Sequence, residues 1–181
     1  MQLQRRALLP LVTAFASLVG IAGCASSRTS PAPPPRPQVP ATLEPAATEA
    51  VSTRAAAKGV QIYECQAEGW KLVGPDAELT DDSGRRLGRH YAGPTWEASD
   101  GSKVVGELRQ KVDAPGGQGV PWLLLKAKST EGTGAFSRIT SIQRVNTTGG
   151  KAPSQACDAS SQGRRQSVPY QATYYFYSGA S

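Results

Sequence analysis

Histidine is almost absent from this sequence of 181 residues, which contains one, His90. Most catalytic zinc and copper sites use two or more histidine ligands, so such sites are excluded and no metal or other cofactor is predicted. The Gly-x-Ser-x-Gly motif that carries the nucleophile of many serine hydrolases is also missing. No run of five like charges occurs, which argues against nucleic acid as a partner.

The first 23 residues are typical of a secretory signal peptide. Arg5 and Arg6 precede an apolar stretch, residues 7–21, that is too short to span a bilayer comfortably. The stretch ends in Ile21-Ala22-Gly23-Cys24, which resembles the lipobox of bacterial lipoproteins, where cleavage precedes a cysteine that becomes lipidated. An ordinary signal peptide that ends in cysteine is the alternative. No aspartate follows Cys24 directly, so the resemblance implies an anchor in the outer membrane, facing the periplasm.

A proline-rich segment, residues 24–44, begins at the lipobox cysteine. It contains repeated prolines and no aromatic residue, so it cannot build a core. Such a segment is a semi-rigid tether, and some twenty residues at about 3.1 Å each would reach up to ~60 Å. The predicted organisation is therefore a signal peptide (1–23), an acylated cysteine with its tether (24–44) and one domain (45–181).

Two cysteines remain once Cys24 is assigned to the anchor, namely Cys65 and Cys157. An even pair in an oxidising compartment predicts a disulfide. In the chain-entropy model, closing so long a loop stabilises a domain by roughly 4 to 5 kcal/mol. A redox-active pair is the alternative, although such pairs usually have the close spacing C-x-x-C.

The positive charge of the chain is scattered over its length. Removal of Arg5 and Arg6 with the signal peptide lowers the formal net charge from +6 to +4. This charge is compatible with a mild attraction to anionic envelope polymers or lipid headgroups. A solvated surface is the simpler explanation.

The region after the tether has the pattern of β-strands. Residues 103–112 and 170–177 alternate along the chain, and residues 120–125 are apolar on both faces, as in a central strand. Turns rich in glycine and proline separate about eight such segments. The pattern predicts an all-β fold with one disulfide, either an antiparallel β-sandwich or a Greek-key barrel. Alanine-rich residues 46–57 are the one place where propensity favours a helix.

Six motifs occur in order along this region: Gly59-Val60-Gln61-Ile62-Tyr63-Glu64-Cys65, Trp70-Lys71-Leu72-Val73-Gly74-Pro75-Asp76-Ala77, His90-Tyr91-Ala92-Gly93-Pro94-Thr95-Trp96-Glu97 with Asp100-Gly101-Ser102, Pro121-Trp122-Leu123-Leu124-Leu125, Ile142-Gln143-Arg144-Val145-Asn146-Thr147 with Gly149-Gly150, and Tyr174-Tyr175-Phe176-Tyr177. Together they resemble the domain-of-unknown-function family 3455, from about Val39 to Tyr177. The resemblance implies a secreted β-domain and no particular chemistry. It also implies that residues 49–57 form a strand, against the helix that their alanine content favours.

A ligand site is predicted where the one histidine lies close to aromatic and acidic residues. His90, Tyr91, Trp96 and Glu97 flank a glycine-proline bend that could bring them together. A sugar ring or another small polar ligand could stack on Trp96 while His90 and Glu97 orient its hydroxyls. The simpler interpretation is a structural corner with the tryptophan in the core.

A second polar run contains Arg144 and Asn146, which could bind a carboxylate or phosphate or pair with an acidic side chain such as Glu97. Residues 81–84 could hold calcium loosely, although a plain turn is the simpler interpretation. We therefore predict a non-catalytic envelope lipoprotein whose domain binds a ligand, a polymer or a partner protein. The alternative is a hydrolase or related enzyme centred on His90, Glu97 and Arg144.

Overall fold

The computed structural model describes residues 32–179, and every statement about the fold refers to this part of the chain. The predicted signal peptide and Cys24 lie outside it. Eight strands and three short 3-10 helices follow in the order η1 (Ala41–Leu43), β1 (Glu49–Gln66), β2 (Gly69–Thr80), β3 (Arg86–Tyr91), β4 (Thr95–Ala98), β5 (Lys103–Val112), η2 (Pro115–Gly117), β6 (Trp122–Glu131), β7 (Ser141–Gly149), η3 (Ala159–Ser161) and β8 (Arg165–Gly179). None of the described helices is long and apolar enough to cross a membrane.

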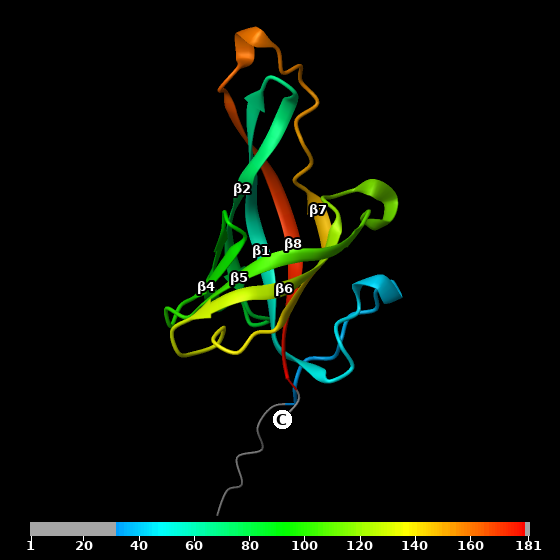
Figure 1. The fold of residues 1–181 in the computed structure, drawn as a ribbon, viewed down its shortest axis with the longest axis vertical. Helices are drawn as coiled ribbons and strands as arrows, with labels where there is room; N and C mark the ends of the chain where they lie inside the picture. Colours follow the sequence, from blue (N-terminus) through cyan, green and yellow to red (C-terminus); the bar gives the residue numbers. More distant parts are fainter. Residues whose placement is uncertain (1–31, 180–181) are drawn as a thin grey trace, which may run out of the picture. The chain divides into compact units, whose positions relative to one another are not determined.

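The eight strands form one closed antiparallel barrel (Figure 1). Each strand pairs with the next in sequence, and β8 closes the barrel by pairing with β1. The predicted all-β antiparallel fold with one disulfide is confirmed. The strand order is up-and-down, so neither finer alternative, a sandwich or a Greek-key barrel, describes it. Every connection therefore links two strands that are neighbours in the sheet. Residues 99–101, for example, form the turn between β4 and β5.

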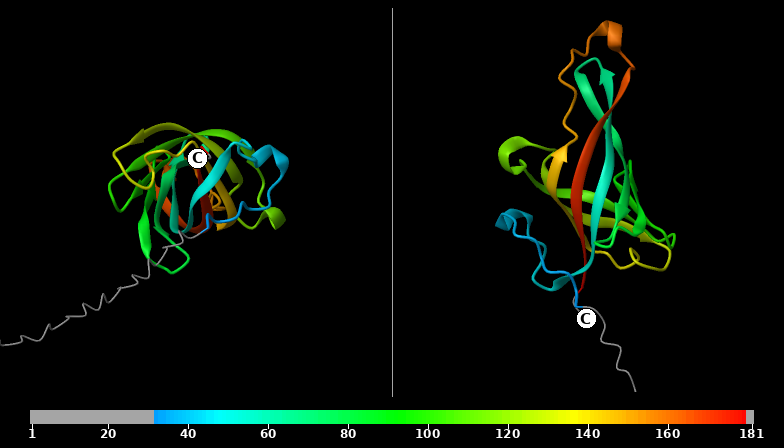
Figure 2. Two further views of the ribbon diagram at one scale, coloured as in Figure 1. Left: turned by 90° about the horizontal axis from the view of Figure 1, so that it is seen from below. Right: turned by 180° about the vertical axis from the view of Figure 1, so that it is seen from behind.

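Strands β1, β2 and β8 are longer than the others and extend beyond them as a twisted ribbon (Figure 2). At the end of this ribbon the predicted disulfide between Cys65 and Cys157 is confirmed, with a Cα–Cα distance of 5.4 Å. It ties the loop that follows β7 to the end of β1. The bond therefore joins segments 92 residues apart in sequence.

The alanine-rich segment is part of β1, as the family resemblance implied and helix propensity did not. Ala55 and Ala57 point into the barrel and are almost completely buried. Ala55 lies opposite Tyr174 on β8, and the same core contains Trp96 and Phe176. Small side chains on β1 leave room for large rings from other strands, so packing overrides the local preference for a helix.

Residues 36–45, which we call the N-terminal strap, pack against the outside of β7 and β8. Leu43 of the strap is fully buried, and its carbonyl accepts a hydrogen bond of 2.6 Å from Gln143 Nε2. The Arg36 guanidinium lies 5.4 Å from the centre of the Tyr177 ring. Because the strap covers this surface, Tyr175 and Tyr177 of β8 are buried on the outer face of the barrel. The last part of the predicted tether is thus in contact with the barrel.

Candidate functional site

The hairpin of β3 and β4 places the predicted site residues on two opposite faces of the sheet. His90 lies opposite Trp96 and points into the barrel, where both side chains are buried. Tyr91 and Glu97 point outward, because successive residues of a strand alternate between faces. Closeness in sequence therefore does not bring all four side chains to one place.

The outward-facing residues form a small polar cluster on the barrel surface. Glu97 Oε2 accepts hydrogen bonds of 2.9 Å from Arg89 Nη2 and 2.8 Å from the Tyr91 hydroxyl. The hydrogen bond from Arg89 is the main reason why the pKa of Glu97 is lowered. Asn146 is exposed on β7, in a left-handed conformation with φ of 51°. None of Tyr91, Glu97 and Asn146 lines the pocket inside the barrel where His90 lies.

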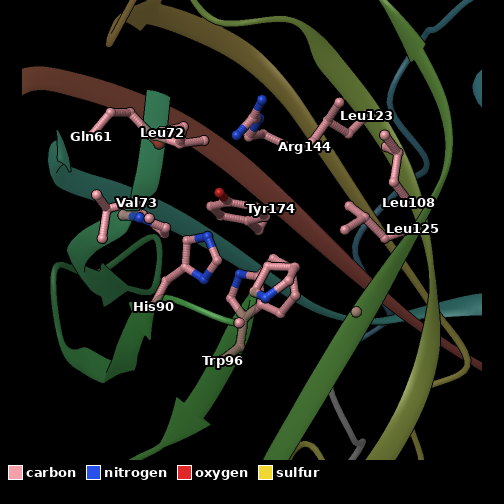
Figure 3. A pocket seen from close by; sticks show the side chains of 15 residues that line it. Gln61, Leu72, Val73, His90, Trp96, Leu108, Leu123, Leu125, Arg144 and Tyr174 are labelled. Carbon is pink, nitrogen blue, oxygen red and sulfur yellow. The ribbon is translucent and has the colours of Figure 1, made fainter. Parts of the chain in front are cut away.

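His90, Trp96 and Arg144 do come together, at a pocket of about 300 Å³ in the barrel (Figure 3). Its other lining residues include Tyr174 and a group of leucines from β2, β5 and β6. The ring of Trp96 fits beneath the pocket because residue 106 is a glycine. A Cβ atom at Gly106 would lie 2.9 Å from that ring.

The histidine in this pocket is held neutral by its surroundings. Its ring stacks on Trp96, with centroids 4.3 Å apart, and meets the edge of Tyr174 at 5.1 Å. His90 Nδ1 lies 2.8 Å from the carbonyl oxygen of Thr95, which can only accept, so we assign the ring proton to Nδ1. Burial lowers the pKa of His90 to about 3, although this hydrogen bond acts in the opposite direction. At neutral pH the ring is uncharged.

Three buried hydrogen-bond donors at the pocket have no partner among the described residues. They are Gln61 Nε2, Trp96 Nε1 and the Tyr174 hydroxyl, each on a side chain of a residue that is 1% exposed. Leaving a buried donor unpaired costs about 1 to 3 kcal/mol. Native proteins rarely tolerate such groups without a reason, and three at one pocket favour a ligand that carries acceptors.

Of the residues that the structure describes, Arg144 is the one charged side chain that lines this pocket. It is half-buried on β7, and its Nε and Nη2 atoms donate to the Pro121 carbonyl at 3.2 and 2.9 Å. No carboxylate lines the pocket, and within residues 32–179 Arg144 belongs to none of the ion pairs. Its positive charge contributes to lowering the pKa of His90. The guanidinium is therefore a charge without a counter-ion in the described part of the chain.

The mouth of the pocket is apolar and open to solvent. Leu72, Val73 and Leu108 are exposed by 54%, 40% and 51%, and they are the large hydrophobic side chains that the described barrel exposes. All three line this pocket. Exposed apolar groups that gather at one place mark interaction sites more often than scattered ones do.

Sequence reasoning overlooked Gln61, Tyr174 and the leucines of the mouth. Gln61 did carry a signal, because it is the polar member of the series Ala55, Ala57, Gln61 and Tyr63, which points inward along β1. The leucines carried none, since such residues are common in any strand. Their exposure depends on where the barrel leaves its interior open.

The possible calcium loop is a turn between β2 and β3. Asp81 Oδ1 accepts hydrogen bonds from the backbone of Ser83 and Arg85 and from the Ser83 hydroxyl. The bond from that hydroxyl is the largest contribution that lowers the pKa of Asp81 to about 2. Over residues 32–179, no group of three or more His, Cys, Asp or Glu side chains is arranged to hold a metal ion.

A comparison with known families assigns residues 45–178 to the family described as a protein of unknown function, DUF3455. This match covers well over half of the chain. Comparisons with curated proteins and with solved structures find no match.

Proposed function

The chain belongs to the DUF3455 family, and we propose that its barrel is a non-catalytic binding module for small, mostly apolar molecules. The observation that carries this proposal is the pocket itself, in which an exposed apolar mouth leads to buried donors without partners. Apolar walls with a few convergent polar groups are typical of small-molecule sites. Eight-stranded barrels are wide enough to hold one small ligand.

The pocket does not favour the alternative of a hydrolase. A general base works best with a pKa near the operating pH, whereas the pKa of His90 is lowered to about 3. Its Nδ1 atom bonds to a backbone carbonyl rather than to a carboxylate. Glu97, the acid that this alternative requires, binds Arg89 and Tyr91 on the opposite face of the sheet. The pocket therefore offers a binding surface without an acid-base pair.

Binding can be tested with the protein that lacks residues 1–31, because residues 32–181 form one compact unit with the whole sheet, its core and the disulfide. The fluorescence of N-phenyl-1-naphthylamine, a neutral apolar probe, should rise and saturate at one probe per protein in detergent-free buffer. Leu108→Asp should weaken this binding by placing a charge at the mouth. Ser129→Asp, an exposed position on β6 away from the pocket, is the matched control. Absence of saturable binding to the folded protein would overturn the proposal.

We also propose that a lipid on Cys24 holds the barrel at the periplasmic face of the outer membrane. The arginine pair, the apolar run and the lipobox-like motif support this location. The disulfide agrees with an oxidising compartment. In this proposal the membrane is a partner through the anchor, a small ligand occupies the pocket, anionic envelope polymers interact weakly with the surface, and nucleic acid has no role.

The anchor is tested by membrane fractionation of cells that make the full chain. Cys24→Ser should release the protein from the membrane fraction and abolish the incorporation of labelled fatty acid. Ser26→Ala, which keeps the cysteine, should behave like the wild type. A Cys24→Ser protein that stays in the membrane with unchanged mobility would contradict the anchor without affecting the binding proposal.

A further inference from the structure

The chemistry of the pocket defines the class of ligand more narrowly. Resting on the binding function proposed above, we propose that the ligand is an amphiphile with a carboxylate headgroup, and that this headgroup pairs with Arg144. Among the described residues the guanidinium is the pocket's one charged group, and no carboxylate of these residues balances it there. An unpaired charge in a partly apolar pocket is unfavourable, and an anion that enters with the ligand removes this penalty.

Arg144 keeps donors free for such an anion. A guanidinium has five N–H donors in one plane, and the hydrogen bonds to Pro121 O involve its Nε and Nη2 atoms. The Nη1 atom makes no hydrogen bond within the described barrel. The planar geometry of arginine matches a carboxylate, which can accept two parallel hydrogen bonds.

Further unpaired donors lie on the same side of the pocket as the guanidinium. In Figure 3 the hydroxyl of Tyr174 is turned toward Arg144, and Gln61 enters from the same side. Both side chains are almost completely buried, and among the described residues neither donor has a partner at hydrogen-bond distance. Burial raises the pKa of Tyr174, although Arg144 and Tyr170 lie close enough to its hydroxyl to act in the opposite direction. Two neutral donors and one cation together favour a ligand group that only accepts hydrogen bonds and is negatively charged. A deprotonated carboxylate has this character.

The remaining walls accommodate an apolar body. Leu108, Leu123 and Leu125 gather on another side of the pocket (Figure 3), and Leu108 continues to the exposed mouth. A cavity of about 300 Å³ is at the small end of ligand sites, so it fits a single short or medium alkyl chain rather than a polymer. Apolar walls combined with one cation and buried donors are the lining that an amphiphile requires.

The inference is tested with three ligands that share one ten-carbon tail: decanoate, 1-decanol and decylammonium. Each ligand is added at neutral pH to the protein that lacks residues 1–31 with N-phenyl-1-naphthylamine bound, and the displacement of this probe is measured. Decanoate should bind at least about tenfold more tightly than 1-decanol, and decylammonium should bind most weakly. The ratio of the affinities for decanoate and 1-decanol is then measured in each variant. A change of the pocket that affects both ligands equally cancels in this ratio.

The variants assign the preference to Arg144. Arg144→Gln should bring the affinities of decanoate and 1-decanol to within about twofold, whereas Arg144→Lys should keep only part of the preference, because the charge remains but the two parallel hydrogen bonds are lost. Arg138→Gln removes an equal charge from an exposed loop and should leave the ratio unchanged. Tyr174→Phe removes one donor but keeps the ring, so it should lower the preference even if Arg144→Gln does not fold.

The outcomes separate the inference from the binding function. If the neutral probe does not bind, the binding function fails and the inference fails with it. If the probe binds but 1-decanol displaces it as well as decanoate does, the pocket takes neutral ligands and the inference alone is overturned. A preference for decanoate that survives in folded Arg144→Gln would also overturn it, because the anion would then be held elsewhere.

Discussion

His90 and Trp96 lie face to face inside the barrel, with ring centroids 4.3 Å apart and ring planes within 5° of parallel. They are direct partners across the β3–β4 hairpin, so the register of these two strands creates the stack. The edge of Tyr174 closes the arrangement from β8. Protonation would place a positive charge in this buried aromatic environment, near the positive charge of Arg144.

The first prediction is that the free energy of unfolding falls as the pH decreases below about 6.5, the pKa of an unperturbed histidine. The folded protein holds the pKa of His90 at about 3, so between these two values only the unfolded state takes up the proton. Down to pH 3 this linkage removes on the order of 4 kcal/mol. Chemical denaturation measured from pH 7.5 to 5 should show the onset.

The control for this prediction is His90→Phe, which keeps a ring against Trp96 and cannot take up a proton. Because the chain has no other histidine, the slope between pH 6.5 and 5 should largely disappear in this variant. An unchanged slope in His90→Phe would show that other groups cause the pH dependence. Carboxylates with lowered pKa values, such as Asp81, act at lower pH.

Periodicity and cysteine count were sufficient to predict the antiparallel strands and the disulfide. They were not sufficient to predict the strand order, because the pairing of β1 with β8 joins segments more than a hundred residues apart and leaves no local signal. Strand β5 shows a second limit. Leu108 shares the inward face of Val104 and Gly106, as the alternation predicts, but it lies where the barrel interior is open, so it is at the pocket mouth instead of in the core.

The candidate site could also be predicted only in part, because the sequence shows the type of each residue but not which face of the sheet the closed barrel encloses. His90, Trp96 and Arg144 were identified by residue type, and the fold brings them to one pocket. Glu97 was grouped with them because it is next to Trp96 in sequence, yet adjacent strand residues point to opposite faces. Which face is enclosed depends on the closure of the whole barrel.

The second prediction concerns Glu97, which separates a binding pocket from an acid-base site. Glu97→Gln should leave the affinity for N-phenyl-1-naphthylamine unchanged, because this side chain lies outside the pocket. Loss of its ion pair with the exposed Arg89 should lower the free energy of unfolding by no more than about 1 kcal/mol. Probe titration and denaturant unfolding measure the two effects. A large loss of binding would place Glu97 in the functional site after all.

The third prediction concerns the disulfide at the end of the β1–β2–β8 ribbon. Replacing both Cys65 and Cys157 with serine should lower the free energy of unfolding by roughly 2 to 5 kcal/mol, as measured with denaturant. Reducing agent should destabilise the wild type by a similar amount and leave the double variant unaffected. Probe binding should persist in the folded double variant, because neither cysteine lines the pocket. Equal stability with and without reductant would contradict the prediction.

The fourth prediction tests whether the N-terminal strap belongs to the folded domain. Leu43 is fully buried, and its carbonyl binds Gln143 on the outer face of β7. Leu43→Ala should therefore lower the free energy of unfolding by about 2 to 4 kcal/mol, because it leaves a cavity between the strap and the barrel. Denaturant unfolding of the protein that lacks residues 1–31 measures this loss.

Thr42→Ala is the matched control, because Thr42 is exposed in the same short helix and its truncation should change stability by less than about 0.5 kcal/mol. The comparison decides where the tether ends. If Leu43→Ala is as mild as Thr42→Ala, the strap contributes nothing to the fold and the domain starts near residue 45, where the family match begins. If the loss is large, the segment around Leu43 is part of the domain, and the predicted boundary between tether and domain moves to a position before Leu43.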